Sequence, residues 1–155
     1  MPTEQWNEPR IVAWSQWLLD SYRHWTGRDL ITRSDPERDA QHLFDQRFVV
    51  VSHGTQPDPI LNYGNRAALR LWSMTWDELV TTPSRLTAEP VDRPERERML
   101  EVASKQGYFD GYRGVRTTTS GKRFLVEQAL IWTVLDASGD RVGQAATFAH
   151  WRFLD

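Results

Sequence analysis

The sequence predicts a single α+β domain in which helices cover an antiparallel sheet. Residues 107–153 contain two turn signals, Ser120-Gly121 and residues 137–140, which separate three runs rich in aromatic and β-branched residues. That pattern is typical of a three-stranded antiparallel meander. Upstream, short strand-like runs alternate with segments of helical periodicity, and 155 residues is about the size of one domain. We therefore expect one sheet, built around the meander, with helices packed on it.

An N-terminal helix is predicted from Pro9 to Trp25. Asn7 is a candidate N-cap, and Gly27 is a suitable stop. Apolar residues recur at spacings of three and four along one stripe, which contains Ile11, Trp14, Leu18, Tyr22 and Trp25. Ala13 and Trp17 make this stripe wider than that of an ordinary surface helix. The helix is therefore expected either to cover one face of the sheet or to form a dimer interface.

A second helix is predicted to start where Ser34 and Glu37 fit a capping box, and to end before Phe48. It carries a proline in its first turn, where the missing backbone N–H costs little. Together the two helices form a predicted N-terminal helical extension, residues 1–46. The domain that contains the sheet is expected to occupy residues 47–155.

Two short strands and two short helices are predicted in the first half of this domain. Residues 48–54 form a buried apolar run, and residues 60–63 follow a turn that contains two prolines. Asn65 can cap the first short helix. Thr75 and Glu78 fit a capping box at the start of the second.

An irregular segment, residues 81–90, precedes a longer helix that should begin at Asp92 and stop at Gly107. The meander follows, and its central strand, residues 124–135, is apolar on both faces. If side chains alternate strictly, the even-numbered residues share one face and the odd-numbered residues share the other. Neither face suits solvent. We therefore expect the short helices to cover one face, and the N-terminal helix or a second subunit to cover the other.

Composition excludes several classes of function. The 19 basic and 21 acidic residues nearly balance and form no basic stripe, so a nucleic-acid partner is not expected. The absence of cysteine excludes disulfides, thiolate metal sites and cysteine nucleophiles. The four histidines lack metal-binding spacing, so no metal site is predicted. With no signal-like start and no long apolar run, we expect a cytoplasmic protein that does not contact a membrane.

Several segments resemble the MEKHLA family, which lies within the PAS-like superfamily. Those that resemble MEKHLA proteins are residues 83–90, 112–116 and 143–148. Residues 60–68 and 75–79 are similar to the second strand and short helices of PAS domains, and the two turns of the meander are similar to PAS hairpins. The resemblance runs from about Phe48 to Trp151. It is closest to the small stand-alone bacterial members of the family, whose plant relatives end homeodomain–leucine zipper regulators.

The resemblance implies a PAS-like five-stranded antiparallel sheet with short helices on one face, to which the N-terminal helices are added. It also implies a ligand-sized space between sheet and short helices, and a sensory or regulatory role. It identifies neither a ligand nor a cofactor. Flavin-binding light sensors of this fold need a cysteine on the short helices, so that photocycle is not expected in a chain without cysteine.

Arg116, Glu127 and His150 form a candidate charged cluster. With Ser120-Gly121 as a two-residue turn, Arg116 opposes Leu125 and shares a face with Glu127, while the next hairpin sets Glu127 opposite His150. A three-residue turn would place Arg116 on the face opposite Glu127. The central strand is also one residue longer than common PAS patterns, so a bulge is expected. The cluster is either part of a pocket with proton chemistry or an ion pair beside an edge histidine.

Further candidate ligand contacts lie on other elements. Trp132 should face Ala145 across the meander, as an aromatic wall beside a space lined by small residues. The remaining candidates are Tyr63, Trp72 and Tyr112 for the apolar part of a ligand and Arg85 for an anionic group. Ordinary core packing would explain the aromatic residues equally, and Arg85 could instead hold its own loop, for example through Glu89.

The leading functional prediction is a PAS-like sensory or regulatory module that binds a small aromatic or anionic organic ligand and functions as a homodimer. One alternative is a small enzyme in which Glu127, Arg116 and His150 perform acid–base chemistry in the same pocket. The sequence contains no nucleophile elbow and no phosphate-binding loop, so it favours a non-enzyme and identifies no catalytic residue. A second alternative is a protein-interaction module with a closed core.

Overall fold

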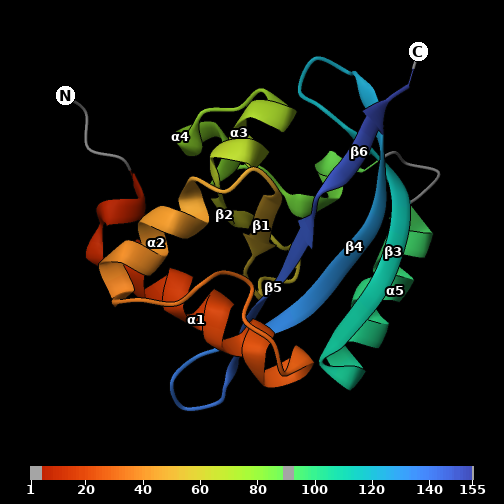
Figure 1. The fold of residues 1–155 in the computed structure, drawn as a ribbon. Coiled ribbons are helices and arrows are strands. Elements are labelled where there is room, and N and C mark those ends of the chain that lie inside the picture. The colour runs from red at the N-terminus through yellow and green to blue at the C-terminus, as the bar shows by residue number, and fades with distance from the viewer. Residues whose placement is uncertain (1–4, 89–92, 155) are drawn as a thin grey trace.

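The computed structural model describes residues 5–88 and 93–154. A six-stranded antiparallel sheet has the order β2-β1-β5-β4-β3, and β6 pairs with β4 (Figure 1). The strands are β1 (Val49–His53), β2 (Leu61–Gly64), β3 (Tyr108–Thr117), β4 (Arg123–Leu135), β5 (Arg141–Phe148) and β6 (His150–Phe153). The helices are η1 (Gln5–Asn7), α1 (Pro9–Thr26), α2 (Pro36–Phe44), α3 (Arg66–Trp72), α4 (Trp76–Leu79), η2 (Ser84–Thr87) and α5 (Arg93–Gln106). The α+β class and the order of elements are as the sequence predicts.

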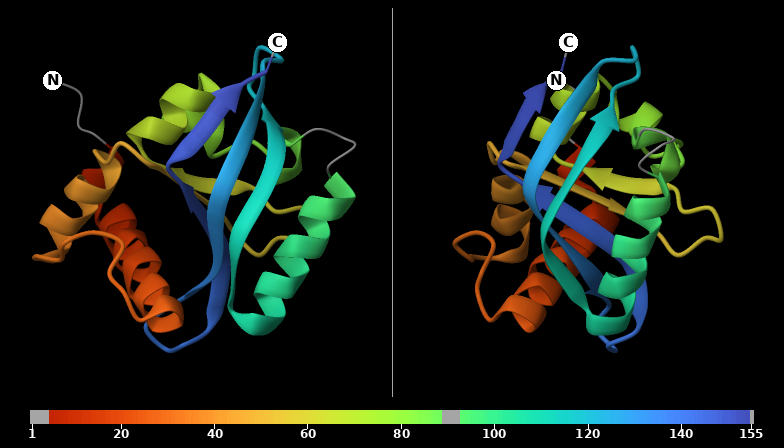
Figure 2. Two further views of the ribbon diagram at one scale, coloured as in Figure 1. Left: turned by 45° about the vertical axis from the view of Figure 1, so that its right-hand side comes forward. Right: turned by 90° about the vertical axis from the view of Figure 1, so that its right-hand side faces the viewer.

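Helices cover both faces of the sheet. Figure 2 shows α1 and α2 on one side and α5 on the other, with α3 and α4 near the β1–β2 end. Two apolar cores result. One contains Leu18, Tyr22 and Trp132 between α1 and the sheet, and the other contains Trp72 and Ile131 on the opposite face. The prediction that both faces of the meander need a cover is therefore confirmed. None of the helices in the described ranges is long and apolar enough to cross a membrane.

Helix α1 is held on the sheet by the polar edges of tryptophan rings. The indole of Trp132 donates to the carbonyl of Leu18 at 3.1 Å, and Trp132 makes an edge contact with Tyr22 at 5.2 Å between ring centroids. In the other direction, Trp25 of α1 donates to the carbonyl of Thr133 at 2.8 Å. Buried indole N–H groups normally find such acceptors. The wide apolar stripe of α1 thus serves as a cover within the same chain.

The ends of α1 and α2 correct two predicted N-caps. Asn7 lies in η1, and the N-cap position of α1 is Glu8, whose side chain makes no capping hydrogen bond. Gly27 does end α1, in the left-handed conformation that glycine favours. At α2 the cap is Asp35, which accepts from the backbone N–H of Arg38 at 2.9 Å. The capping box predicted at Ser34 is wrong, because an aspartate next to the first-turn proline caps equally well.

A buried carboxylate joins α1 and α2. Asp39 accepts hydrogen bonds from Arg33 Nε at 2.8 Å, Gln16 Nε2 at 3.1 Å and the backbone N–H of Ser34 at 2.6 Å. Burial alone would raise the pKa of Asp39, but these hydrogen bonds together outweigh it and lower the pKa. The group is therefore ionised at neutral pH, and it fixes the α1–α2 angle.

The short helices begin where the sequence predicts. Asn65 accepts from the backbone N–H of Ala68 at 3.1 Å and from that of Val50 at 3.1 Å, so it caps α3 and also ties it to β1. Thr75 and Glu78 form both hydrogen bonds of the predicted capping box. The segment after α4 is a short 3-10 helix, η2, rather than wholly irregular. The predicted helix start at Asp92 lies outside the described residues, and α5 is described from residue 93.

The β3–β4 hairpin differs from both predicted registers. Thr117 pairs with Arg123 and Arg116 with Phe124, which is one residue from the pairing that the two-residue turn predicts and two residues from that of the three-residue turn. A bulge then interrupts β4 at Gln128, which has a positive φ of 55°, beside an irregularity at Gly111 of β3. Strict alternation is therefore wrong for β4. Phe124, ahead of the bulge, packs in the same core as the odd-numbered residues beyond it.

The last predicted strand is divided in two, which raises the strand number from five to six. β5 pairs with both β1 and β4 and ends at Phe148, and β6 continues along β4 after Ala149. The break lies opposite the Gln128 bulge, where the left-handed residue interrupts the regular ladder. Beyond the break Glu127 pairs with His150, as the sequence predicts.

Candidate functional site

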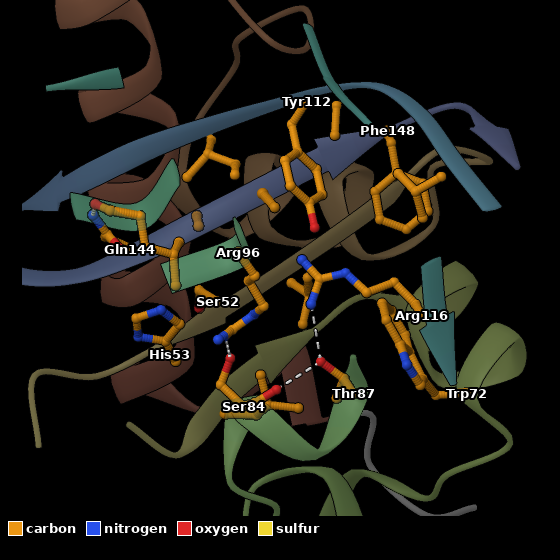
Figure 3. A pocket seen from close by; sticks show the side chains of 18 residues that line it. Ser52, His53, Trp72, Ser84, Thr87, Arg96, Tyr112, Arg116, Gln144 and Phe148 are labelled. Carbon is orange, nitrogen blue, oxygen red and sulfur yellow. Dashed lines mark hydrogen bonds between the residues drawn. The ribbon is translucent and has the colours of Figure 1, made fainter. Parts of the chain in front are cut away.

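The candidate site is an internal cavity of about 40 Å³ between the sheet and the layer formed by α3, η2 and α5 (Figure 3). Its walls are mostly apolar, since they include Val51, Leu61, Leu100, Val126, Ile131 and Phe148. β-strands provide one wall and helices the other. A cavity of this kind, apolar with a few convergent polar groups, is the usual form of a small-molecule site.

Two arginines and two hydroxyl residues form the polar side of the cavity. Arg116 of β3 donates to Thr87 Oγ1 at 3.3 Å, and Thr87 in turn donates to the carbonyl of Ser84 at 2.7 Å. Arg96 of α5 donates to Ser84 Oγ and is only 5% exposed. Figure 3 shows both guanidinium groups directed toward the interior. The hydroxyl of Tyr112 faces the guanidinium group of Arg116. Hydroxyls of η2 therefore hold both cations in place.

The charged side chains that line the described part of the cavity are arginines. Among the described residues that line it, two are arginines and none is an aspartate or glutamate. The Arg116 guanidinium lies 5.4 Å from the centre of the Tyr112 ring, a cation–π contact, and makes no ion pair with any carboxylate in the described part of the chain. A cation in an apolar surrounding without a carboxylate nearby favours an anion.

His53 of β1 supplies the opposite kind of polar group. Its Nδ1 lies 2.8 Å from the carbonyl of Gly54, and because a carbonyl only accepts, Nδ1 carries the proton. Burial lowers the pKa of His53, and the positive charges of Arg96 and Arg116 lower it further. The ring is then neutral at neutral pH. Its Nε2, a free acceptor, is buried without a hydrogen-bond partner among the described residues.

The structure brings some predicted site residues together and separates others. Trp72, Tyr112 and Arg116 line the cavity. Tyr63 and Trp132 are fully buried in the other core, on the α1 side. The predicted pairing of Trp132 with Ala145 is present, but the Trp132 ring packs on α1 instead of forming a cavity wall.

Two charged candidates lie at the surface. Arg85 pairs with Asp58 at 3.2 Å, an exposed contact between its loop and the β1–β2 connection. Glu127 is 3.9 Å from both Arg113 and Arg152 and is 43% exposed on its side chain. Exposed pairs of this kind contribute little to stability. The loop-holding interpretation of Arg85 is the one that its geometry favours.

The predicted cluster of Arg116, Glu127 and His150 does not form. Arg116 lines the cavity, whereas Glu127 and His150 do not and instead face each other between β4 and β6. The physical reason is the register of the β3–β4 hairpin, which places Arg116 opposite Phe124. Glu127 keeps only ion-pair neighbours. Within the described residues no three His, Asp or Glu side chains gather as a metal site would require.

Sequence reasoning missed six polar residues of the cavity: Ser52, His53, Ser84, Thr87, Arg96 and Gln144. They come from β1, η2, α5 and β5, which are distant in sequence. The family-like segment 83–90 contains two of them, so it could have directed attention to their hydroxyls instead of to Arg85. Nothing local distinguishes Arg96 from the other charged residues of α5.

Comparison with known proteins supports the family and the fold. The model of the MEKHLA domain family matches residues 12–153, which include most of α1. Among curated proteins, the homeobox-leucine zipper protein REVOLUTA of Arabidopsis thaliana is 26% identical over 94% of this chain, and HOX10 of Oryza sativa subsp. indica is 22% identical over 94%. The chain spans only 18% of the length of each of these relatives.

Solved PAS and light-oxygen-voltage structures share the fold. A PAS domain from Colwellia psychrerythraea has a TM-score of 0.63 and 14% identity, covering 76% of this chain and 95% of its own. An RNA-binding light-oxygen-voltage receptor has a TM-score of 0.61 and 17% identity, covering 81% of this chain and 36% of its own. At these identities the similarity concerns the fold alone.

The cavity does not fit a flavin, the group that the light-oxygen-voltage neighbours suggest. Cofactor pockets are typically a few hundred Å³ in volume. Here the space is about 40 Å³, and the arginine side chains of β3 and α5 project into it. The chain also lacks the cysteine that a flavin adduct would need. No flavin chemistry is therefore assigned to this site.

Proposed function

Because the chain belongs to the MEKHLA domain family and has a PAS-like fold, we propose that it is a sensory or regulatory module whose internal cavity binds a small organic anion. The observation that carries the proposal is Arg116, a guanidinium that faces an apolar cavity without a carboxylate partner among the described residues. A bound anion would supply the missing partner.

The Arg116 side chain is half-buried and faces the apolar cavity. Among the described residues, the partners of the Arg116 side chain are a neutral hydroxyl and an aromatic face, and both compensate a full charge weakly. Arg96, the second guanidinium that lines the cavity, donates to Ser84 Oγ. A carboxylate that meets a guanidinium away from bulk water makes a charge-assisted hydrogen bond, which is roughly twice as strong as a neutral one.

The sheet offers a physical route from ligand to response. Neighbouring residues of β4 face opposite layers, since Ile131 lines the cavity and Trp132 bonds to α1. A ligand that draws η2 and α5 toward the sheet would change the packing of β4, and the change would reach α1 on the other face. A sensor needs an element such as β4 that can take two arrangements, because ligand binding must favour one of them.

Ligand capture tests the proposal directly. The purified 155-residue chain is analysed by native mass spectrometry and by thermal unfolding against a panel of organic acids, aromatic compounds and neutral metabolites. We expect an acid to be retained or to raise the melting temperature, and Arg116→Gln to abolish the effect. Arg113→Gln is the matched control, because Arg113 lies on the same strand but does not line the cavity.

Failure of that experiment would favour the interaction module with a closed core. If neither measurement detects any small molecule from the whole panel, the cavity is only a packing defect and the sensory proposal is wrong. Turnover of a panel compound that requires Glu127 would instead revive the enzyme alternative, with chemistry outside the cavity.

A homodimer is also part of the proposal. Its support is the apolar surface that remains on the outside, namely Phe153 at 52%, Leu86 at 47% and Tyr108 at 38% exposure. Phe153 lies on β6, which pairs with β4 along one edge and can offer the other to a second copy. Sedimentation velocity of the wild type and of Phe153→Lys tests it. A monomeric wild type at micromolar concentration would refute the dimer.

A further inference from the structure

The size of the cavity restricts its occupant to a few non-hydrogen atoms. Space of about 40 Å³ accommodates about three water-sized groups, since each needs roughly 10–15 Å³ of such volume. The aromatic side chains of Trp72, Tyr112 and Phe148 already form the walls, so a ring-bearing ligand would have to displace one of them. Of the two ligand types that the sequence suggests, aromatic and anionic, a small anion fits the space.

One side of the cavity presents donors. Arg116 uses one N–H on Thr87 and directs the rest of its guanidinium toward the Tyr112 hydroxyl (Figure 3). That hydroxyl makes no hydrogen bond within the described residues, so it can donate to a ligand. Gly114 provides the room for it, because a Cβ there would lie 2.4 Å from the Tyr112 oxygen. A guanidinium with an adjacent hydroxyl is a donor set for a carboxylate.

The other side presents an acceptor. Figure 3 shows His53 and Gln144 at the end of the cavity away from Arg116, with Arg96 between. Gln144 uses its amide N–H on the carbonyl of Leu100 at 2.9 Å. The buried Nε2 of His53 has a lone pair, and no group among the described residues donates a hydrogen bond to it. A ligand group that reaches this end must therefore donate a hydrogen bond.

The charge of the cavity decides which donor is suitable. An ammonium group could donate to His53 but would lie close to the guanidinium of Arg96, and like charges at short range repel each other. A hydroxyl donates without carrying charge. The two ends together therefore select a carboxylate at one end and a hydroxyl at the other.

We propose that the cavity selects a short-chain hydroxy acid, whose carboxylate is bound by Arg116 and Tyr112 and whose hydroxyl donates to His53 Nε2. This inference rests on the proposed ligand-binding function and adds the class of ligand. The apolar walls contributed by Leu61, Val126 and Ile131 enclose the carbon atoms in between.

Isothermal titration calorimetry at pH 7.5 on the full chain tests the ligand class with matched probes. Glycolate and lactate are each compared with the acid that lacks the hydroxyl, acetate and propionate. Lactamide removes the charge, and alanine replaces the hydroxyl with ammonium. We expect the best hydroxy acid to bind about 3–10-fold more tightly than its parent acid, and at least about 10-fold more tightly than the uncharged and ammonium analogues.

Variants assign each end of the ligand. His53→Leu should reduce the preference for hydroxy acid over parent acid to about one while leaving the parent acid bound. Arg116→Gln should weaken both acids by about 10-fold or more, since it removes a charge-assisted hydrogen bond. Gly114→Ala should weaken both less severely by displacing the Tyr112 hydroxyl. Arg113→Gln should change nothing, and melting temperatures verify that every variant folds.

The outcomes separate this inference from the proposed function. A neutral or aromatic compound that binds most tightly, unaffected by Arg116→Gln, overturns the hydroxy-acid inference and leaves a sensor of another ligand. Equal binding of parent and hydroxy acids, or an unchanged preference in His53→Leu, refutes the role of His53. Absence of binding by every probe in the wider panel as well overturns both proposals together.

Discussion

Gln128 adopts a backbone conformation that costs free energy, and substitution there tests whether the β4 bulge is a built feature. Its φ of 55° lies in the left-handed region, which costs a residue with a side chain about 1–2 kcal/mol. Gln128→Gly removes that cost but adds about 0.5–1 kcal/mol of chain entropy, so we expect a gain of about 0.5–1 kcal/mol. Gln128→Val places a β-branched residue in the same conformation and should lose about 1 kcal/mol or more.

The expected difference between the two variants is therefore about 2 kcal/mol, or about 4–8 °C in melting temperature for a domain of this size. Urea unfolding followed by circular dichroism measures it. Asp110 of β3 is exposed and does not have a positive φ, and it serves as the control. There the order should reverse, since valine is a better strand residue than glycine. If Gln128→Val is as stable as Gln128→Gly, β4 has no bulge at this residue.

Three further predictions concern stability. Asp39→Ala should lose about 2–3 kcal/mol in urea unfolding, because it leaves Arg33 half-buried without its closest acceptor. The pKa of His53 is lowered in the folded state, so the unfolded chain binds more protons below pH 6.5 and stability should fall there as pH decreases, by at most about 1.4 kcal/mol per pH unit. His53→Leu should flatten that part of the pH profile, and a wild-type profile without such a decline would contradict the assignment. Trp132→Phe should lose about 1–2 kcal/mol, since it removes the hydrogen bond to Leu18 and part of a buried ring; an unchanged urea midpoint would show that this contact contributes nothing.

Capping residues in the sequence were sufficient to predict most of the helix boundaries that depend on them. Asn65, Thr75 and Gly27 each end or begin a helix as the sequence predicts, because a cap depends on groups within three or four residues. The failures are also local. Asn7 and Ser34 were each one residue from the actual N-cap, and at both places more than one cap or first-turn residue was available.

The site was predicted less well than the fold. Trp72, Tyr112 and Arg116 line the cavity, but no sequence argument related them to His53 or Arg96. These residues lie on separate strands and helices, and their distance depends on how α5 and η2 pack on the sheet. No periodicity or spacing encodes that packing.

The sequence by itself determined that the meander is apolar on both faces, and therefore that helices must cover it on both sides. It also determined the MEKHLA resemblance and the absence of thiol chemistry. Only the tertiary structure decided which side chains of β3 and β4 share a face. Side chains alternate with a period of two, so one residue more in a turn or at the Gln128 bulge moves every later side chain to the other face. That single-residue difference separates Arg116, in the cavity, from Glu127, at the surface.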